Sequence, residues 1–196
     1  MKIKRLLNDF FYYFFKTILS IIFFILYHPK IVGKEKIPKK GACVIAGNHR
    51  HIYDPCCVCV STHRQVHYLA THLLFEPFYG FFFRLIGCIK VKEKGNENAL
   101  EEAEEVLNNG GLIGIYPEGK RNFTDETLLP FKTGAVRMAK ATNTPILPFC
   151  IVGEYKRFFN NLKVVYGEPF YVGDMDVHEA TELLQNKVLK LIEENK

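Results

Sequence analysis

The sequence has no internal repeat, no linker and no low-complexity tract. Repeat arrays and loosely joined domains are therefore excluded, and 196 residues with 48% hydrophobic content are the size of one domain with a full core. The sequence also has little excess charge: the net charge is +5, and the charged fraction of 24% is ordinary for a globular protein. Because net charge alone indicates no particular partner, the placement of the charges matters more.

Regularly spaced cysteines are missing too. The six cysteines lie mostly within apolar stretches, and their spacing along the chain does not indicate a disulfide framework. We interpret them as reduced, buried, small hydrophobic residues in a cytosolic compartment. They are Cys43, Cys56, Cys57, Cys59, Cys88 and Cys150.

One long apolar run, FFYYFFKTILSIIFFILY, covers residues 10–27 and has basic residues on both sides. A small-residue cleavage site does not follow it, and His28-Pro29-Lys30 is unsuited to one, so the run is not typical of a secretory signal peptide. As one helix it would be about 27 Å long, which is borderline for crossing the hydrocarbon core of a bilayer. Its length alone therefore does not decide between spanning a membrane and lying on one.

Charges in and around this run favour a position on one side of the membrane. Lys16 divides the run, and basic flanks at both ends give the positive-inside rule no reason to favour a crossing. The sequence predicts a helix, or a bent helical pair, embedded in one leaflet with both ends in the cytoplasm. A single spanning helix and a helix packed only on its own domain are the alternatives. The basic flanks suit anionic lipids better than nucleic acid, so membrane lipids are an expected partner and nucleic acid is not.

Short β-like runs alternate with helical patterns after Pro29. This alternation predicts an α/β fold with a mixed, largely parallel central sheet flanked by helices. We expect an N-terminal anchoring segment at 1–28 and one domain at 29–196. The predicted strands are 31–37, 42–46, 66–70, 86–91, 112–116, 146–152 and 162–166, and the predicted helices are 55–63, 72–85, 96–108, 133–141 and 177–194.

The segment GNHRHIYDP, residues 47–55, follows one predicted strand and precedes a helix. His49 and Asp54 would be roughly 140° apart on a continuous helix, so they meet only if His49 lies on the loop and Asp54 starts the helix. Asp-Pro is a favoured pair at a helix start. The carboxylate could then hold one imidazole nitrogen and leave the other free as a base. The alternative is that Asp54 merely caps the helix and His49 is an ordinary loop residue.

A second polar segment, YPEGKR at 116–121, follows another apolar strand. Lys120 and Arg121 beside Gly119 suit a phosphate group, because arginine offers a bidentate fork and glycine lets the backbone approach. A solvated turn is the alternative. Two more segments, LPFKTGA at 129–135 and TPILPF at 144–149, would be unremarkable alone.

Taken in order, these four segments resemble the glycerolipid acyltransferase family over about residues 30–170. Asn48, His49 and Asp54 match the family's N-H-x-x-x-x-D motif. The family's F-P-E-G-T-R motif is matched by Pro117, Glu118, Gly119 and Arg121, with Tyr116 for phenylalanine and Lys120 for threonine. Further family features are matched by Phe131, Lys132 and Gly134 and by the proline-bracketed strand at 145–148.

One family motif, G-x-I-x-V-D-R, is altered in this sequence. Residues 87–93, GCIKVKE, have Lys92 and Glu93 where the family has Asp-Arg, and that arginine helps bind the acceptor phosphate. Lys90, Lys92 or Lys94 could replace the missing charge, and Lys92 stands within the motif itself, although lysine lacks the bidentate fork. His51 also stands where the family often has a small residue. The altered motif leaves the head group of the acceptor open.

The resemblance implies transfer of a fatty acyl group from an acyl thioester, on acyl carrier protein or coenzyme A, to the free sn-2 hydroxyl of lysophosphatidic acid. The product would be phosphatidic acid for phospholipid synthesis, made at the cytoplasmic face of the cell membrane by a peripheral or monotopic protein. It also implies that His49, held by Asp54, takes the hydroxyl proton without an acyl-enzyme, a cofactor or a metal. The implied substrate-binding residues are Asn48, Lys92, Glu118, Gly119, Lys120, Arg121 and Lys132.

Three alternatives remain. One is an acyltransferase for a different lysophospholipid head group, and another is a non-catalytic lipid-binding protein of the same fold. The third is a metal-dependent hydrolase, because Cys56, Cys59 and His63 fall at i, i+3 and i+7 on one face of the predicted helix.

Overall fold

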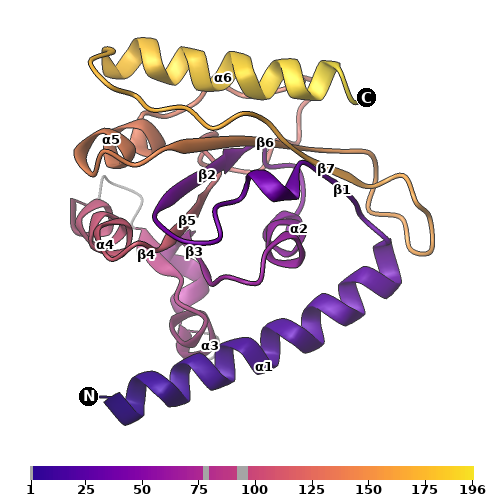
Figure 1. Ribbon diagram of the computed structural model, residues 1–196. Helices are drawn as coiled ribbons and strands as arrows, with labels where there is room; N and C mark the ends of the chain where they lie inside the picture. Colours follow the sequence, from indigo (N-terminus) through magenta and orange to yellow (C-terminus); the bar gives the residue numbers. More distant parts are fainter. Residues whose placement is uncertain (1, 77–79, 92–96) are drawn as a thin grey trace.

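The computed structural model describes residues 2–76, 80–91 and 97–196. Its seven-stranded sheet has the order β1-β7-β6-β2-β5-β3-β4 and is parallel except between β6 and β7, as Figure 1 shows. The predicted mixed, largely parallel sheet flanked by helices is confirmed. The strands are β1 (Lys30–Val32), β2 (Cys43–Gly47), β3 (Val66–Thr71), β4 (Ile89–Val91), β5 (Leu112–Ile115), β6 (Ile146–Val152) and β7 (Lys163–Tyr166).

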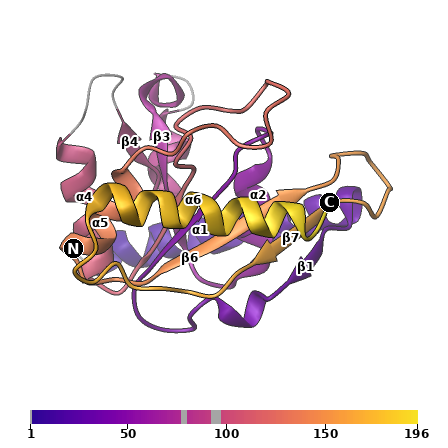
Figure 2. The same cartoon turned by 90° about the horizontal axis from the view of Figure 1, so that it is seen from above.

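Helices cover both faces of this sheet. Side chains alternate along each strand, so Cys43 and Ile45 of β2 enter one core while Val44 and Ala46 enter the other. The α4, α5 and α6 helices close the core on the second side, and α1 and α2 close it on the first (Figures 1 and 2). The helices are α1 (Lys2–Tyr27), α2 (Asp54–Ser61), α3 (Gly80–Leu85), α4 (Glu97–Asn108), α5 (Gly134–Ala141) and α6 (Val177–Glu193), with 3-10 turns at Lys34–Lys36 and His72–Phe75.

The strand predicted at 31–37 is shorter than expected. It ends at Val32 because Gly33 has a φ of 75°, which turns the chain into a 3-10 helix. A Cβ on Gly33 would also lie 2.7 Å from the carbonyl oxygen of Tyr166, so only glycine fits there. The expected strand was too long because the sequence does not show the contact between Gly33 and Tyr166 that ends it.

The helix predicted at 72–85 is interrupted. A 3-10 turn ends at Phe75, and Glu76 is extended with a ψ of 157°, as expected for a residue that precedes a proline. Residues 77–79 lie outside the described residues, and α3 begins at Gly80. Gly87, with a φ of 80°, then closes α3 through hydrogen bonds from Gly87 N to Arg84 O and from Cys88 N to Phe83 O, so the next strand starts at Ile89 rather than 86.

The α1 helix is one continuous helix rather than a bent pair. Its stripe of Tyr12, Phe23 and Tyr27 is buried against the domain, and Lys16 Nζ on the same side donates to the carbonyl oxygen of Arg64 at 2.6 Å. The charge of Lys16 therefore does not interrupt the outward face, whose aromatic and aliphatic side chains are 41–64% exposed. By length and composition alone, Phe10–Tyr27, with a mean hydropathy of 1.8, is also long enough to cross a membrane.

Candidate active site

The first two polar segments lie at one edge of the sheet. They follow β2 and β5, which are parallel neighbours whose carboxyl ends meet at that edge. The backbone joins them directly, because Asn122 N donates to His49 O at 2.7 Å. The loop after β2 and the turn after β5 therefore form one site.

Asp54 is the best-connected side chain of this site. It is the first residue of α2, it is fully buried, and its Oδ2 lies 2.7 Å from His49 Nδ1. The backbone N–H groups of Arg50 and His51 also donate to Oδ2, at 2.7 and 2.8 Å. These donors offset the cost of burying a carboxylate, and the predicted geometry of loop histidine and helix-start aspartate is confirmed.

His49 presents a nitrogen that can act as a base. An ionised carboxylate only accepts hydrogen bonds, so Nδ1 carries the proton that Asp54 binds, and Nε2 keeps its lone pair. Among the described residues Nε2 has no hydrogen-bond partner, and the side chain is 19% exposed. The ring stacks on Tyr116 at a centroid distance of 4.2 Å, which fixes the plane in which the lone pair points.

Glu118 holds the backbone of the histidine. It is buried, and its two carboxylate oxygens accept from His49 N at 2.6 Å and from Leu129 N at 2.9 Å. Burial raises the pKa of Glu118, and the two N–H donors partly oppose that shift. The side chain thus ties together the loop after β2 and the segment at 129. In this structure Glu118 positions the backbone of His49, and its predicted substrate contact stays a prediction.

Asn48 is likewise occupied by the backbone. Its Nδ2 donates to Ile151 O at 2.9 Å, and its Oδ1 accepts from Ile151 N at 2.8 Å. The amide is buried and locks the end of β2 to β6. Asn48 therefore orients the loop after β2, and the substrate contact expected for it stays a prediction.

Three cations lie on or against the turn after β5. Gly119 has a φ of 71°, and a Cβ there would lie 2.7 Å from Lys132 Nζ, so the glycine makes room for that lysine. Lys120 and Arg121 are exposed on the same turn, and Arg121 lies over the ring of Phe123 at 4.9 Å. None of these three cations pairs with a carboxylate among the described residues. Lys92, the fourth predicted cation, lies outside the described residues.

Tyr155 is a site residue that the sequence did not indicate. Its phenol donates to Asp54 Oδ1 at 2.5 Å, its oxygen lies 3.2 Å from Cys57 Sγ, and its ring stacks on His51 at 4.3 Å. Burial raises the pKa of Tyr155 far above the usual value, so the phenol remains a donor at any working pH. The segment between β6 and β7 that carries it has no local motif, and only the fold brings it to α2.

Comparison with known protein families identifies the family of this chain. The family described as "Acyltransferase" matches residues 28–152, which include the catalytic pair and the turn after β5. The chain belongs to the acyltransferase family. The resemblance inferred from the four motifs is thereby confirmed.

Individual relatives of this acyltransferase agree with that assignment. A protein of Borreliella burgdorferi is 29% identical over 178 residues, covering 83% of this chain and 71% of the relative. One of Bacillus subtilis is 29% identical over 170 residues, covering 83% of this chain and 84% of the relative. Both are named 1-acyl-sn-glycerol-3-phosphate acyltransferase. The crystal structure of the 1-acyl-sn-glycerophosphate (LPA) acyltransferase of Thermotoga maritima has the same fold, with a TM-score of 0.79 and 22% identity over 99% of this chain and 83% of that one.

The described residues do not show the arrangement of Cys56, Cys59 and His63 that the metal-site alternative requires. The α2 helix ends at Ser61, so His63 does not share a helical face with Cys56 and Cys59. In the part of the chain that the structure describes, no three His, Cys, Asp or Glu side chains are grouped as a metal site would require. The six thiols are free and buried or half-buried, and burial raises the pKa of Cys56 to about 12.

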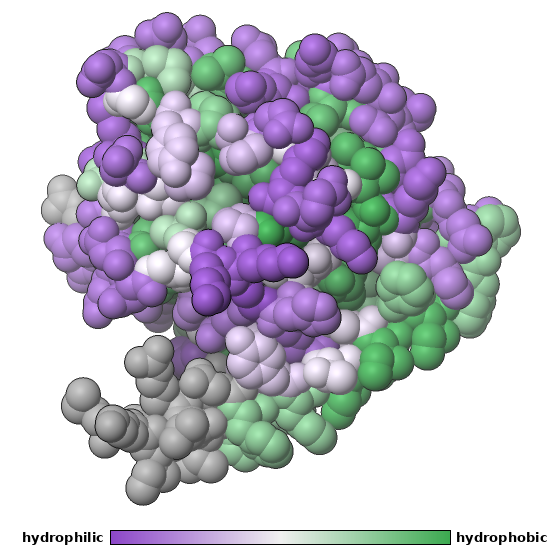
Figure 3. Space-filling view, viewed as in Figure 1, coloured by the Kyte–Doolittle hydropathy of each residue, from purple (hydrophilic) through white to green (hydrophobic). Residues whose placement is uncertain are grey.

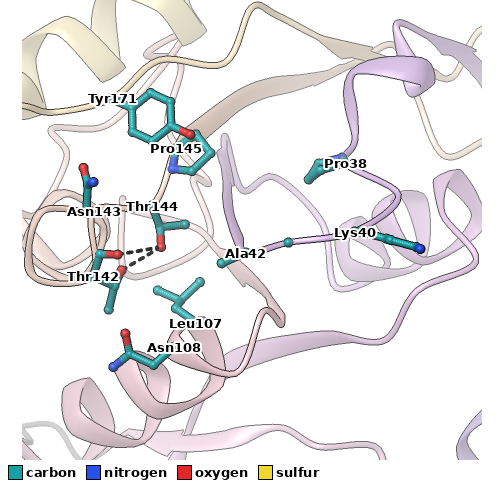
Figure 4. A pocket seen from close by; sticks show the side chains of 11 residues that line it. Pro38, Lys40, Ala42, Leu107, Asn108, Thr142, Asn143, Thr144, Pro145 and Tyr171 are labelled. Atoms are coloured by element: carbon teal, nitrogen blue, oxygen red, sulfur yellow. Dashed lines mark hydrogen bonds between the residues drawn. The ribbon is translucent and has the colours of Figure 1, made fainter.

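A hollow of about 400 Å³ opens at the other end of the sheet, where β2 and β6 begin (Figure 4). Its lining includes Lys40, Thr144 and Tyr171 and contains no residue predicted for the acyltransferase site. The catalytic pair therefore lies at the carboxyl ends of the strands and away from this hollow.

Proposed function

We propose that this acyltransferase moves a fatty acyl group from an acyl thioester to the sn-2 hydroxyl of 1-acylglycerol-3-phosphate and so makes phosphatidic acid. Acyl carrier protein or coenzyme A would carry the donor. The observation that carries the proposal is the 2.7 Å contact between His49 Nδ1 and buried Asp54, with Nε2 left free beside a cationic turn. The names of the two bacterial relatives support the choice of acceptor.

The reaction uses His49 as a general base. Nε2 takes the proton of the acceptor hydroxyl while the oxygen attacks the thioester carbonyl. The resulting tetrahedral intermediate expels the thiolate, which receives the proton from His49. Asp54 stabilises the imidazolium formed in between, and no acyl-enzyme is needed.

The acceptor phosphate would bind to the cationic turn. Lys120, Arg121 and Lys132 come from two segments that the structure brings together at Gly119. An exposed arginine can bind phosphate through two parallel hydrogen bonds, and the neighbouring lysines add charge. The turn is tied to His49 through Asn122, so a phosphate held there lies near the base.

The membrane would deliver both acyl chains to this site. Phe23 and Tyr27 of α1 contact Tyr53 of the catalytic loop at centroid distances of 6.5 and 5.8 Å. The opposite face of α1 is apolar and exposed, which suits a helix embedded in the cytoplasmic leaflet. Cysteine labelling of Ile3→Cys and Val32→Cys in intact cells tests this orientation, and labelling of position 3 from outside the cell would contradict it.

A substrate panel tests the proposed activity. Detergent-solubilised protein receives labelled acyl donor with either lysophosphatidic acid or lysophosphatidylcholine, and phosphatidic acid is the expected product. Preference for lysophosphatidylcholine would instead support a different head group. Binding of both lipids without turnover would support a non-catalytic lipid-binding protein.

A further inference from the structure

Two exposed aromatic side chains lie outside the site and outside α1. They belong to residues 153–162, which join β6 to β7 and which we name the aromatic loop. Phe158 is 70% exposed and Phe159 is 52% exposed. The proposed chemistry makes no use of either ring. Two adjacent exposed phenylalanines on one loop form an apolar patch that the fold itself does not explain.

The aromatic loop is fastened to the end of α1. Phe158 N donates to Leu26 O at 2.7 Å, so the loop satisfies a carbonyl that the last turn of the helix leaves unpaired. Phe158 also has a φ of 63°, a conformation that is strained for a bulky residue. The loop thus holds an exposed phenylalanine in an unfavourable backbone conformation directly beside the carboxyl end of the apolar helix.

Positive charge accompanies these rings. Lys156 Nζ lies 4.2 Å from the centroid of Phe159, and Arg157 is exposed between them. Aromatic rings with adjacent lysine and arginine are typical of protein surfaces that lie at the headgroup level of anionic bilayers. Figure 3 shows apolar residues along α1 and toward the right side of the view, where Figure 1 places the aromatic loop.

We propose that the aromatic loop is a second membrane contact, in which Phe158 and Phe159 insert at the headgroup boundary of an anionic leaflet. The proposal rests on the attachment of α1 proposed above, because the hydrogen bond to Leu26 fixes the loop in line with that helix. Continuity with the outward face of α1 favours a lipid surface over a protein partner. The same loop carries Tyr155, so this contact holds the bilayer next to the catalytic carboxylate.

The absence of tryptophan from the sequence allows a direct test. Phe158→Trp gives the full-length protein a single tryptophan in the loop, and Tyr171→Trp gives a matched, exposed control in the hollow of Figure 4. With vesicles of phosphatidylcholine and phosphatidylglycerol, we expect a blue shift and quenching by brominated acyl chains for Phe158→Trp only. Co-sedimentation of the same samples shows that the protein is bound. Bound protein without a shift or quenching at position 158 would overturn the proposal.

A second pair of variants measures the contribution of the loop to binding. Phe158→Ala/Phe159→Ala should lower the vesicle partition coefficient about tenfold, whereas Tyr171→Ala should leave it unchanged. Unchanged vesicle binding of the double variant would overturn the proposal. Unchanged binding with a selective loss of activity toward acyl carrier protein, but not coenzyme A, would assign the loop to the donor protein instead. Phosphatidic acid synthesis in detergent is measured separately, so failure of the loop proposal leaves the proposed reaction intact.

Discussion

At the scale of single residues, the orientation of His49 depends on side chains and backbone from distant parts of the chain. Asp54 holds its ring, Glu118 accepts from its N–H, and Asn122 donates to its carbonyl oxygen. The Nδ1, N and O atoms of His49 each have one such partner, so the imidazole has little freedom to turn. Such pre-organisation is what a general base requires, since a small misplacement reduces the rate.

His49→Ala should abolish acyl transfer and leave the fold intact. Loss of a general base typically costs about 10² to 10⁴-fold in rate, and a half-buried loop side chain contributes little to the core. Turnover and thermal unfolding are measured on the same preparation. Retention of more than about a tenth of wild-type turnover would contradict the role, and His51 would become the candidate base.

Tyr155→Phe should lower kcat on the order of tenfold while KM stays near the wild-type value. The variant removes one donor from a buried carboxylate, and hydrogen bonds to charged groups contribute about 1.5–3 kcal/mol. Asp54 would then be held less firmly toward His49, so the loss should fall on kcat and leave the apparent affinity for both substrates unchanged; kinetics with each substrate varied in turn measure both quantities.

Tyr53→Phe is the control for Tyr155→Phe. Tyr53 belongs to the same aromatic cluster, but its phenol has no hydrogen-bond partner among the described residues. Its kcat and KM should both match the wild type. A change of both kcat and KM in Tyr155→Phe, together with a loss of thermal stability, would instead assign Tyr155 a purely structural role.

Arg121→Ala should weaken use of the phosphorylated acceptor more than use of the acyl donor. Its guanidinium is exposed on the turn that Asn122 ties to His49, and it offers the best fork for phosphate among the matched motifs. Kinetics with each substrate varied in turn measure the two effects, and exposed Arg137 on α5 supplies the control variant Arg137→Ala. An equal loss for both substrates, or no loss, would assign Arg121 to structure.

At the scale of elements, local signals predicted most of the strands and the geometry of His49 and Asp54. Asp-Pro marks a helix start within the sequence itself, so a six-residue segment indicated how His49 and Asp54 could meet. Contacts over long separations had no such signal: Tyr155 lies 101 residues from Asp54, and Asn48 lies 103 residues from Ile151. The sequence likewise could not show that Lys16 turns inward, because its partner is a backbone oxygen far along the chain.

Ile18→Glu/Ile22→Glu on α1 should release the protein from anionic vesicles without unfolding it. Both side chains are exposed on the outward face. Each substitution removes on the order of 1 kcal/mol of favourable transfer of an isoleucine side chain from water to lipid. It also adds a negative charge that anionic lipids repel. These substitutions test anchoring more cleanly than deletion of residues 1–27, which would also uncover the core contacts of Tyr12, Phe23 and Tyr27.

Lys16→Ala is the matched control for the α1 variant. It removes an inward hydrogen bond, so it should lower thermal stability slightly and leave vesicle binding unchanged. Undiminished co-sedimentation of Ile18→Glu/Ile22→Glu would contradict the anchoring role of the helix.

At the scale of the whole molecule, the topology brings α1 and the candidate active site to the same side of the sheet. The parallel pair β2 and β5 presents both motif loops at one edge of the sheet, and α1 packs beside the same loops through Tyr53 and Tyr155. The helices α4 to α6 cover the opposite face, as Figures 1 and 2 show. The His49 loop thereby lies on the same side of the sheet as the apolar surface that α1 exposes.

The most direct test of the account follows a labelled acyl group from thioester to lipid. Purified protein in detergent is incubated with isotopically labelled acyl-coenzyme A or acyl carrier protein and lysophosphatidic acid, and the lipid product is analysed by mass spectrometry. The account predicts phosphatidic acid labelled at the sn-2 position with wild-type protein and a loss of about 10² to 10⁴-fold with His49→Ala. Formation of free labelled fatty acid without phosphatidic acid, or equal synthesis by His49→Ala, would contradict it.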